Sequence, residues 1–350
     1  MFQNLVGNNQ IKRVLHRMLQ HQRIPGSMIF AGGEGVGKRL FAFELAKAKL
    51  CHNPQNFEAC DRCASCQRID NLTLPKSSDK DENEKIFFTQ HPDVGFIRPA
   101  GKFITVEIIR ELQAEAVLRP FEGTNNETGA RFFIVDDADR MNEAAANALL
   151  KTLEEPAPTT YIILLTARLD SLLQTIRSRC QILRFAPIET VEIENYLGRS
   201  KQTSPNDVKL IARIAQGSLG KAAAANLELY KQQREQMLNV LEAIVLSNDR
   251  ARLLRIAEDL NDAKHKDEYE DRLSVLQILI HDVWALRLEA DSQKIINVDL
   301  AAKLTKLAQH TESRQAQAWL SEVEILRENF VVNINRKIAT DALFMKMASV

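Results

Sequence analysis

Short apolar runs alternate with helical patterns along the first half of this chain. Five runs have the length and the β-branched or aromatic content of buried strands: 27–32, 93–99, 131–136, 161–167 and 180–185. Apolar residues at three- and four-residue spacing predict helices between these runs: 9–22, 38–50, 105–118 and 142–154. Thr105 is the expected N-cap of the third helix. This alternation predicts an α/β domain with a parallel sheet over residues 1–187.

After Pro187 the strand pattern stops. Three short helical segments in 188–229 predict a small helical lid, with Ser204 as an N-cap and Gly217 as a helix end. From 230 to 350 long amphipathic stretches follow, which predict an all-helical C-terminal domain in which Trp284 belongs to the core or to a subunit contact. The sequence therefore predicts three domains.

Charge and composition exclude several classes of protein. The 46 Lys and Arg residues balance the 46 Asp and Glu residues, so no overall positive field holds nucleic acid. Four cations at 12, 13, 17 and 23 make the first helix basic, and we read them as a solvated face. The run at 71–90 is rich in charge and is expected to be a surface insertion. No leader or spanning segment is evident, so we expect a cytoplasmic protein.

A glycine-rich loop, GGEGVGKR at 32–39, stands between an apolar run and a helical pattern. Such a loop lets backbone N–H groups surround phosphate oxygens, and a lysine at its end supplies charge for the outer phosphates. The candidate nucleotide-binding residues are Gly32, Gly35, Gly37 and Lys38. An ordinary glycine-rich turn is the alternative, and the flanking strand and helix argue against it.

Two positions depart from the pattern of hydrolysing enzymes. Arg39 stands where a Ser or Thr hydroxyl would coordinate Mg²⁺, so nucleotide binding is expected without hydrolysis. Asp136 and Asp137 follow a buried strand at the sheet edge where ligands bind. Asp136 is the candidate for the metal's water shell. Asp137 is one methylene shorter than the Glu that orients water in hydrolases, and an equally weighted alternative is that it caps the next helix.

Four cysteines form a compact cluster with the spacing C-x8-C-x2-C-x2-C: Cys51, Cys60, Cys63 and Cys66. Four thiolates suit a closed tetrahedral Zn²⁺ site with a structural role. The spacing alone leaves an iron–sulfur cluster open. Cys180 lies outside the cluster and is expected to be a small core residue.

Several motifs together resemble a known family. They are HPD at 91–93, IREL at 109–112, IVDDAD at 134–139, NALLKTLEEP at 147–156 and TIRSRCQ at 175–181. In combination they resemble the clamp-loader branch of the AAA+ ATPases, and within it the delta-prime subunits of bacterial DNA polymerase III. The match runs from about residue 2 through the lid and more weakly into the C-terminal helices, which would then form a collar. The family carries a similar cysteine module, which favours zinc.

The resemblance implies roles for three further residues. The arginine of the SRC motif, Arg179, would be a finger donated to ATP bound by a neighbouring subunit. Without the family, Arg179 reads as a surface charge beside Arg177. Thr166 would be the residue that senses the γ-phosphate, and Gly220 stands where motor subunits carry a lid arginine.

We therefore expect a largely inert clamp-loader subunit that is not an enzyme by itself. Its implied partners are ATP-hydrolysing motor subunits and a delta subunit in a hetero-oligomeric ring, and through the ring a sliding clamp and primed DNA. The main alternative is an active ATPase motor of the same branch, which Lys38, Asp136 and Thr166 permit. A zinc-dependent nucleic-acid binder is a third hypothesis that the neutral net charge disfavours.

Overall fold

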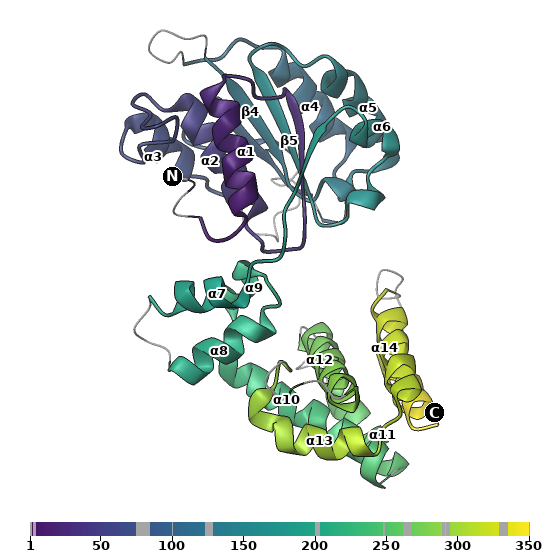
Figure 1. Cartoon of the computed structure of the whole chain (residues 1–350). Coiled ribbons are helices and arrows are strands. Elements are labelled where there is room, and N and C mark those ends of the chain that lie inside the picture. Colours follow the sequence, from purple (N-terminus) through teal and green to yellow (C-terminus); the bar gives the residue numbers. More distant parts are fainter. Residues whose placement is uncertain are drawn as a thin grey trace. The chain divides into compact units, whose positions relative to one another are not determined.

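The computed structural model describes most of the chain: residues 2, 5–74, 85–99, 101–122, 129–199, 204–247, 249–261, 268–288, 291, 295–328 and 335–349. Half of the predicted surface insertion at 71–90, residues 75–84, lies outside these residues. The chain divides into two compact units (Figure 1). One unit contains residues 1–203 and 215–223, and the other contains 204–214 and 224–350. We call them the sheet unit and the helical unit.

The sheet unit is built on six strands in the order β2-β3-β4-β5-β1-β6. The strands are β1 (Ser27–Ala31), β2 (Phe87–Phe88), β3 (Val94–Ile97), β4 (Arg131–Val135), β5 (Thr160–Thr166) and β6 (Gln181–Arg184). All neighbours pair in parallel except β2, which pairs antiparallel with β3. The strand before the glycine-rich loop, β1, therefore has parallel neighbours on both sides.

Helices cover both faces of this sheet (Figure 1). The helices α1 (Asn9–Gln20), α2 (Lys38–Leu50) and α3 (Ala64–Asp70) lie on one side, and α4 (Val106–Ala116), α5 (Glu143–Glu154) and α6 (Gln174–Arg177) lie on the other. Alternate residues of each strand contribute to two hydrophobic cores, one on each face of the sheet. Phe30 and Phe132 pack toward α1 and α2, whereas Ile29 and Phe133 pack toward α4 and α5. Because both faces are buried, the strands read as continuous apolar runs.

The five predicted strands and four predicted helices of this unit are confirmed to within a few residues. The sequence patterns missed β2, α3 and α6, because elements of two, seven and four residues are too short to show a period. The predicted sheet is parallel apart from β2. Thr105 stands at the N-cap position of α4, but its side chain makes no cap hydrogen bond.

The three short helices predicted after residue 187 are also present: α7 (Thr190–Leu197), α8 (Pro205–Ile214) and α9 (Leu219–Ala224). Ser204 caps α8, since its Oγ accepts a hydrogen bond from the Asp207 N–H at 3.2 Å. In the compact units, α7 and α9 group with the sheet and α8 groups with the C-terminal helices. The boundaries of a separate lid domain at 188–229 therefore remain a prediction.

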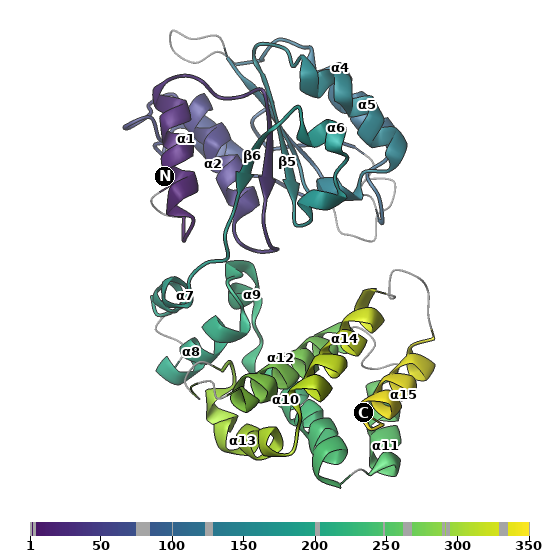
Figure 2. The same ribbon diagram turned by 45° about the vertical axis from the view of Figure 1, so that its right-hand side comes forward.

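The helical unit surrounds its longest helix, α12 (Tyr269–Arg287). Besides α8, its other described helices are α10 (Leu227–Glu242), α11 (Arg250–Leu260), α13 (Ala301–Gln309), α14 (Ser313–Glu328) and α15 (Arg336–Met347). Three of them, α10, α13 and α14, pack against α12, and α11 packs against α15 (Figure 2). Trp284 on α12 is partly buried against the shared core, and Trp319 on α14 is fully buried. Within the described residues, none of the helices has the length and apolar character needed to cross a membrane.

One buried ion pair fixes the amino end of the central strands. Asp93, just before β3, and Arg131, at the start of β4, are both fully buried, with 3.5 Å between Asp93 Oδ1 and Arg131 Nε. The Asp93 carboxylate also accepts backbone N–H bonds from Phe121 and Glu122 at 2.9 and 3.0 Å. The HPD motif thus ties the segment after α4 to the sheet.

Replacing Asp93 by alanine should remove one of the two carboxylates that pair with the buried Arg131 and leave the other, Glu115, whose Oε2 lies 2.8 Å from Arg131 Nη2. We expect β3 and β4 to lose about 3–5 kcal/mol of opening free energy, the usual cost of breaking a buried pair. Hydrogen exchange of the β3 and β4 amides measures this loss. Asp170→Ala, which breaks a solvent-exposed pair with Arg177 at 2.9 Å, should leave that protection unchanged. Equal protection in the two variants would contradict this reading.

Candidate phosphate loop and cysteine cluster

The glycine-rich loop lies at the carboxyl edge of the sheet, where β1 ends. Gly32 follows Ala31, and its N–H donates to the carbonyl of Thr166, at the end of β5, at 3.1 Å. Gly35 and Gly37 have φ values of 70° and 99°, a region in which side chains are strained. The helix α2 then begins at Lys38. This strand–loop–helix arrangement is the one that the sequence predicts for phosphate binding.

Lys38 turns back onto the loop. Its ammonium donates to the carbonyls of Gly32 and Gly33 at 2.6 and 2.7 Å. Burial lowers the pKa of Lys38, and the nearby carboxylates of Asp136 and Asp137 oppose that shift. The lysine therefore lies among loop carbonyls that it partly neutralises.

The segment before α9 rests on the same loop. The Gly220 N–H donates to the Gly35 carbonyl at 3.0 Å, and a Cβ on Gly35 would lie 2.2 Å from Ser218 Oγ. Gly220 itself approaches Gly35 so closely that its own Cβ would lie 3.0 Å from the Gly35 Cα. A side chain at position 220 would therefore require the loop to shift by a few tenths of an ångström. The departure seen in the sequence thus accompanies a direct contact between the two glycines.

Arg39 faces the first carboxylate at the end of β4. Its Nη1 lies 3.9 Å from Asp136 Oδ2, and its guanidinium lies 5.9 Å from the ring centroid of Phe96. Burial raises the pKa of Asp136, and Asp137 raises it further, whereas Arg39 opposes the shift. The residue that replaces the Mg²⁺-binding hydroxyl is therefore a cation beside the carboxylate expected to hold the metal's water.

The remaining predicted residues at this edge are engaged elsewhere. Thr166 is buried, and its hydroxyl donates to Asp139 Oδ1 at 2.7 Å. Asp139 also accepts two hydrogen bonds from Arg168. Asp137 is half exposed with φ 46° and makes no side-chain cap bond, so the capping alternative is wrong. Sequence reasoning missed Asp139, although it belongs to the IVDDAD motif.

Arg179 lies at the other edge of the sheet. It follows α6 and precedes β6, whose Gln181 pairs with Met28 of β1 in parallel. Its Nε donates to Glu154 Oε2 at 2.9 Å, and its Nη1 donates to the Thr175 carbonyl at 3.1 Å. Glu154 is the last residue of α5. Sequence reasoning missed this partner, and membership of the LLKTLEEP motif was the only signal.

The four cysteines of the cluster come together after α2. Their Sγ atoms all lie within 4.8 Å of one another. Sγ of Cys63 lies 3.9 Å from that of Cys51 and 3.5 Å from that of Cys66. A tetrahedron with metal–sulfur bonds of about 2.3 Å has sulfur–sulfur edges of about 3.8 Å. The thiols therefore fit one metal ion.

Backbone N–H groups support this cluster. The N–H of Cys60 donates to Cys51 Sγ and that of Cys63 donates to Cys60 Sγ, both at 3.3 Å. Such bonds, led by one from Arg62, lower the pKa of Cys60 to about 6. Burial instead raises the pKa values of Cys51 and Cys66. The site is thus closed and thiol-only, as a structural metal requires. Cys180 lies apart, and burial raises its pKa to about 12.

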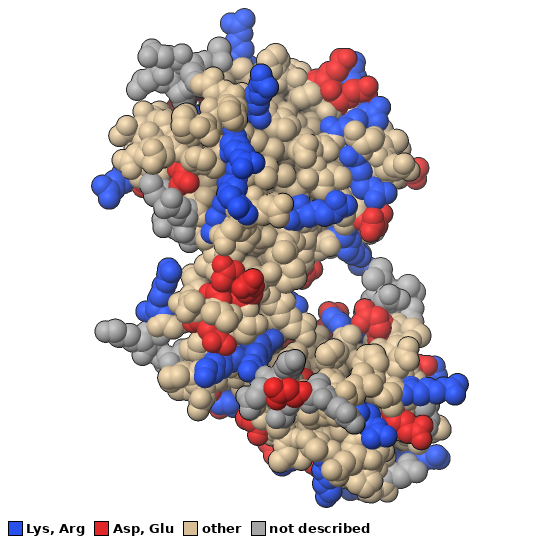
Figure 3. Space-filling model, in the orientation of Figure 1, with Lys and Arg blue, Asp and Glu red and all other residues tan. Residues whose placement is uncertain are grey.

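Other polar features have structural explanations. His91 is buried, its Nδ1 accepts the Asp93 N–H at 3.2 Å, and burial lowers its pKa. The basic residues of α1 form a row on the surface (Figure 3), where Arg13 and Arg17 are exposed. His91 therefore has a structural contact within the HPD motif, and the exposed arginines agree with the solvated face predicted for α1.

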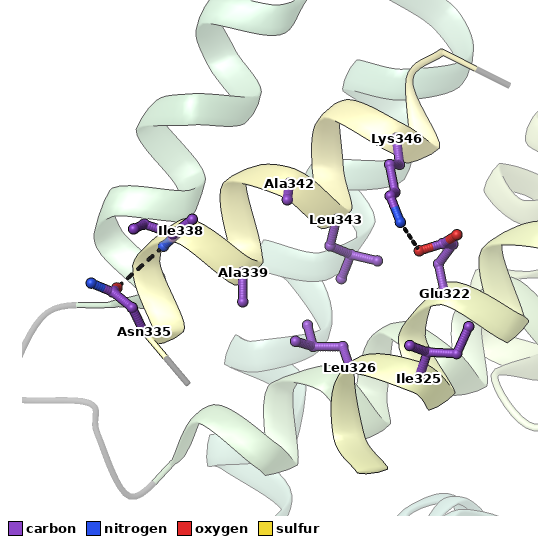
Figure 4. Close-up of a pocket in the computed structure, with 9 residues that line it drawn as sticks. All are labelled: Glu322, Ile325, Leu326, Asn335, Ile338, Ala339, Ala342, Leu343 and Lys346. Atoms are coloured by element: carbon purple, nitrogen blue, oxygen red, sulfur yellow. Dashed lines mark hydrogen bonds and ion pairs between the residues drawn. The ribbon is translucent and has the colours of Figure 1, made fainter. Parts of the chain in front are cut away.

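A groove of about 360 Å³ lies in the helical unit between α14 and α15 (Figure 4). Apolar side chains line most of it, among them Leu326, Ala339 and Leu343. The Lys346 ammonium pairs with Glu322 at 2.9 Å at one end. The two charged residues that line it thus engage each other, and the candidate residues of the sequence analysis lie in the sheet unit.

Two family models match the chain. The model described as DNA polymerase III, delta subunit, matches residues 7–189, and the model described as DNA polymerase III, delta subunit, C terminal, matches residues 228–346. The first covers the whole sheet with both of its edges. The second covers the helices from α10 to α15.

Curated relatives match over almost the full length. A DNA polymerase III subunit delta' of Escherichia coli is 29% identical over 348 residues, covering 99% of this chain and 92% of its own. A protein of the same name from Bacillus subtilis is 26% identical and covers 93% of this chain and 92% of its own. Among solved structures, a gamma subunit-related protein of Thermotoga maritima has a TM-score of 0.43 at 20% identity and covers 96% of this chain and 98% of its own.

Proposed function

We propose a specific role for this chain from one premise: it belongs to the DNA polymerase III delta subunit family, as a delta-prime-type component of the bacterial clamp loader. The predicted resemblance and the predicted α/β AAA+ module with a helical C-terminal unit are thereby confirmed. Our proposal is that the chain hydrolyses no ATP itself and donates Arg179 to ATP held by a neighbouring motor subunit.

The position of Arg179 supports donation to a neighbour. Gln181 of β6 is level with Met28 of β1, so Arg179 is level with the entry to β1, whereas the phosphate loop follows its exit. The five residues of β1 separate the two levels, which is about 17 Å at the rise of a β-strand. An arginine side chain does not span that distance. Arg179 is therefore excluded from its own phosphate loop and is available only to another subunit.

The contacts of Arg179 favour the same role. Glu154 holds its Nε and Thr175 holds its Nη1, while Nη2 makes no hydrogen bond to any part of the chain that the structure describes. The arginine is about one-third exposed. A guanidinium gripped from its Nε side presents its remaining N–H groups outward, where a phosphate oxygen of a neighbour's nucleotide would accept them. Glu154 is the positioning residue in this proposal.

The geometry of the phosphate loop argues against the alternative, an active motor. Arg39 takes the position of the metal-binding hydroxyl, Thr166 already donates to Asp139, and Gly220 lies against Gly35. Asp137 stands where hydrolases carry a water-orienting Glu, and its carboxylate lies 3.8 Å from Arg140 Nη1. We propose that this loop binds ATP or ADP weakly and does not hydrolyse it.

The cysteine cluster completes the proposal. We propose that Cys51, Cys60, Cys63 and Cys66 bind one structural Zn²⁺, which anchors the segment after α2. We further propose that the chain works in the cytoplasm, in a ring with motor and delta subunits that loads a sliding clamp onto primed DNA. Relatives named as subunits of DNA polymerase III, delta' among them, support assembly with other subunits of that complex.

Arg179→Ala should leave the chain folded and able to assemble while it slows ATP hydrolysis at the adjacent motor site. A finger supplied in trans contributes a factor of about 10³–10⁵, so turnover at that one site should fall by about 10³ or more. Single-turnover hydrolysis by the reconstituted clamp loader measures this effect. An unchanged rate would show that Arg179 is no finger. Hydrolysis by the isolated chain that Lys38→Ala abolishes would instead establish the motor function.

Glu154→Gln tests the positioning role with a matched control. The variant keeps the shape of the side chain but removes the charge that holds Arg179, so kcat at the adjacent site should fall by about tenfold while KM stays constant. Asp170→Asn is the control, because it weakens an equally short pair with the neighbouring Arg177. If both variants lower kcat equally, Glu154 has only a general structural effect.

Cys66→Ser should release the metal, because Cys66 is buried at the centre of the cluster. Elemental analysis of the purified wild-type chain should find one zinc per chain, and the variant should lose it. A zinc-sensitive dye that chelates the released ion would report the same loss. Cys180→Ser, outside the cluster, should keep the full zinc content. Iron with sulfide in the wild-type chain would identify an iron–sulfur cluster instead.

A further inference from the structure

The phosphate loop offers backbone donors while its carbonyls are occupied. Lys38 binds the carbonyls of Gly32 and Gly33, and Gly220 binds that of Gly35. For the backbone N–H groups of residues 33–38, by contrast, the described part of the chain supplies no acceptor. A loop with free N–H groups and neutralised carbonyls attracts anions. The polyphosphate of a nucleotide fits this donor set.

Arg39 gives this loop a second side-chain cation beside Lys38. Its guanidinium is held between the ring of Phe96 and the carboxylate of Asp136, and the side chain is 55% exposed. Because the contact with Asp136 is long, at 3.9 Å, the guanidinium keeps donors for another acceptor. A planar fork of this kind binds two phosphate oxygens at once.

Mg²⁺ does not fit the same residues. The ion requires oxygen ligands in near-octahedral geometry, and the hydroxyl that would follow Lys38 is replaced by a guanidinium with no acceptor atom. Asp136, the carboxylate expected to bind the metal's water, faces that guanidinium. A divalent cation placed there would stand next to a permanent positive charge.

We propose that this loop binds the polyphosphate of a nucleotide without a metal ion, and that Arg39 takes the place of Mg²⁺. The inference rests on nucleotide binding in the proposed function and is independent of the role of Arg179. When phosphate arrives, the loop amides receive its oxygens, Lys38 exchanges its carbonyl partners for the outer phosphate, and Arg39 neutralises the charge that a metal neutralises in hydrolysing relatives. Nucleotide then serves as a bound structural ligand.

The experiment measures binding of ADP labelled with a methylanthraniloyl fluorophore to the purified full-length chain, by anisotropy, in EDTA and in Mg²⁺. The wild-type Kd in EDTA should be no weaker than the Kd in Mg²⁺. Unlabelled inorganic pyrophosphate should displace the probe, because the phosphates carry the recognition. Arg39→Ala should weaken binding in EDTA by about tenfold or more, the worth of one charge-assisted hydrogen bond.

The sharpest variant is Arg39→Ser, which restores the hydroxyl and removes the cation. Its binding should be weak in EDTA and should recover in Mg²⁺, so that the metal dependence absent from the wild-type chain appears. Arg13→Ser, which removes an exposed arginine from α1, should bind as the wild-type chain does in both buffers. Arg179→Ala should also retain binding, which separates this inference from the finger proposal.

Two results would overturn the inference. One is that Mg²⁺ lowers the Kd of the wild-type chain by as large a factor as it lowers the Kd of Arg39→Ser. This result would show that the metal binds despite Arg39. The other is a wild-type chain that binds no labelled ADP in either buffer, or from which pyrophosphate displaces none.

Discussion

The parallel pairing of β1 with β5 on one side and β6 on the other determines where every candidate group lies. It brings the ends of β1 and β5 together, so that Gly32 and Thr166 share a hydrogen bond at the carboxyl edge. It equally places the entry to β6, and Arg179 just before it, at the amino edge. The phosphate loop and Arg179 therefore lie at opposite ends of the same strands. The sheet register, more than any one side chain, separates these two candidate sites.

The phosphate loop keeps the residues that shape a phosphate-binding turn, whereas the residues around it depart from the pattern of hydrolysing enzymes. The glycines and the lysine remain, because they shape the turn between β1 and α2. The catalytic surroundings differ: a guanidinium stands beside Asp136, an aspartate engages Thr166, and a glycine rests on Gly35. Each of these contacts lies within the chain itself, and the hydrogen bonds of Thr166 and Gly220 engage groups at the edge of the loop.

Much of the fold was predictable, because its strands are buried on both faces and read as uninterrupted apolar runs. The loop and the cysteine cluster were also predictable, since their residues are close in sequence and their spacing reflects a local geometry. The pairs that control the site were not. Glu154 lies 25 residues from Arg179, and Asp139 lies 27 residues from Thr166. These residues come into contact only in the folded sheet, so composition and sequence spacing do not predict the contacts. The same holds for Gly220, whose contact with Gly35 depends on where α9 begins.

The placement of the tryptophans gives the two units separate optical signals. The chain has two tryptophans, Trp284 and Trp319, and both lie in the helical unit. The aromatic residues of the sheet unit are phenylalanines and tyrosines such as Phe132 and Tyr161. Emission excited at the red edge of the protein absorption band therefore originates in the C-terminal helices alone. Tryptophan fluorescence of the unlabelled protein consequently reports unfolding of the helical unit, whereas circular dichroism reports unfolding of the whole chain. Comparing the two melting curves distinguishes concerted unfolding of the two units from stepwise unfolding.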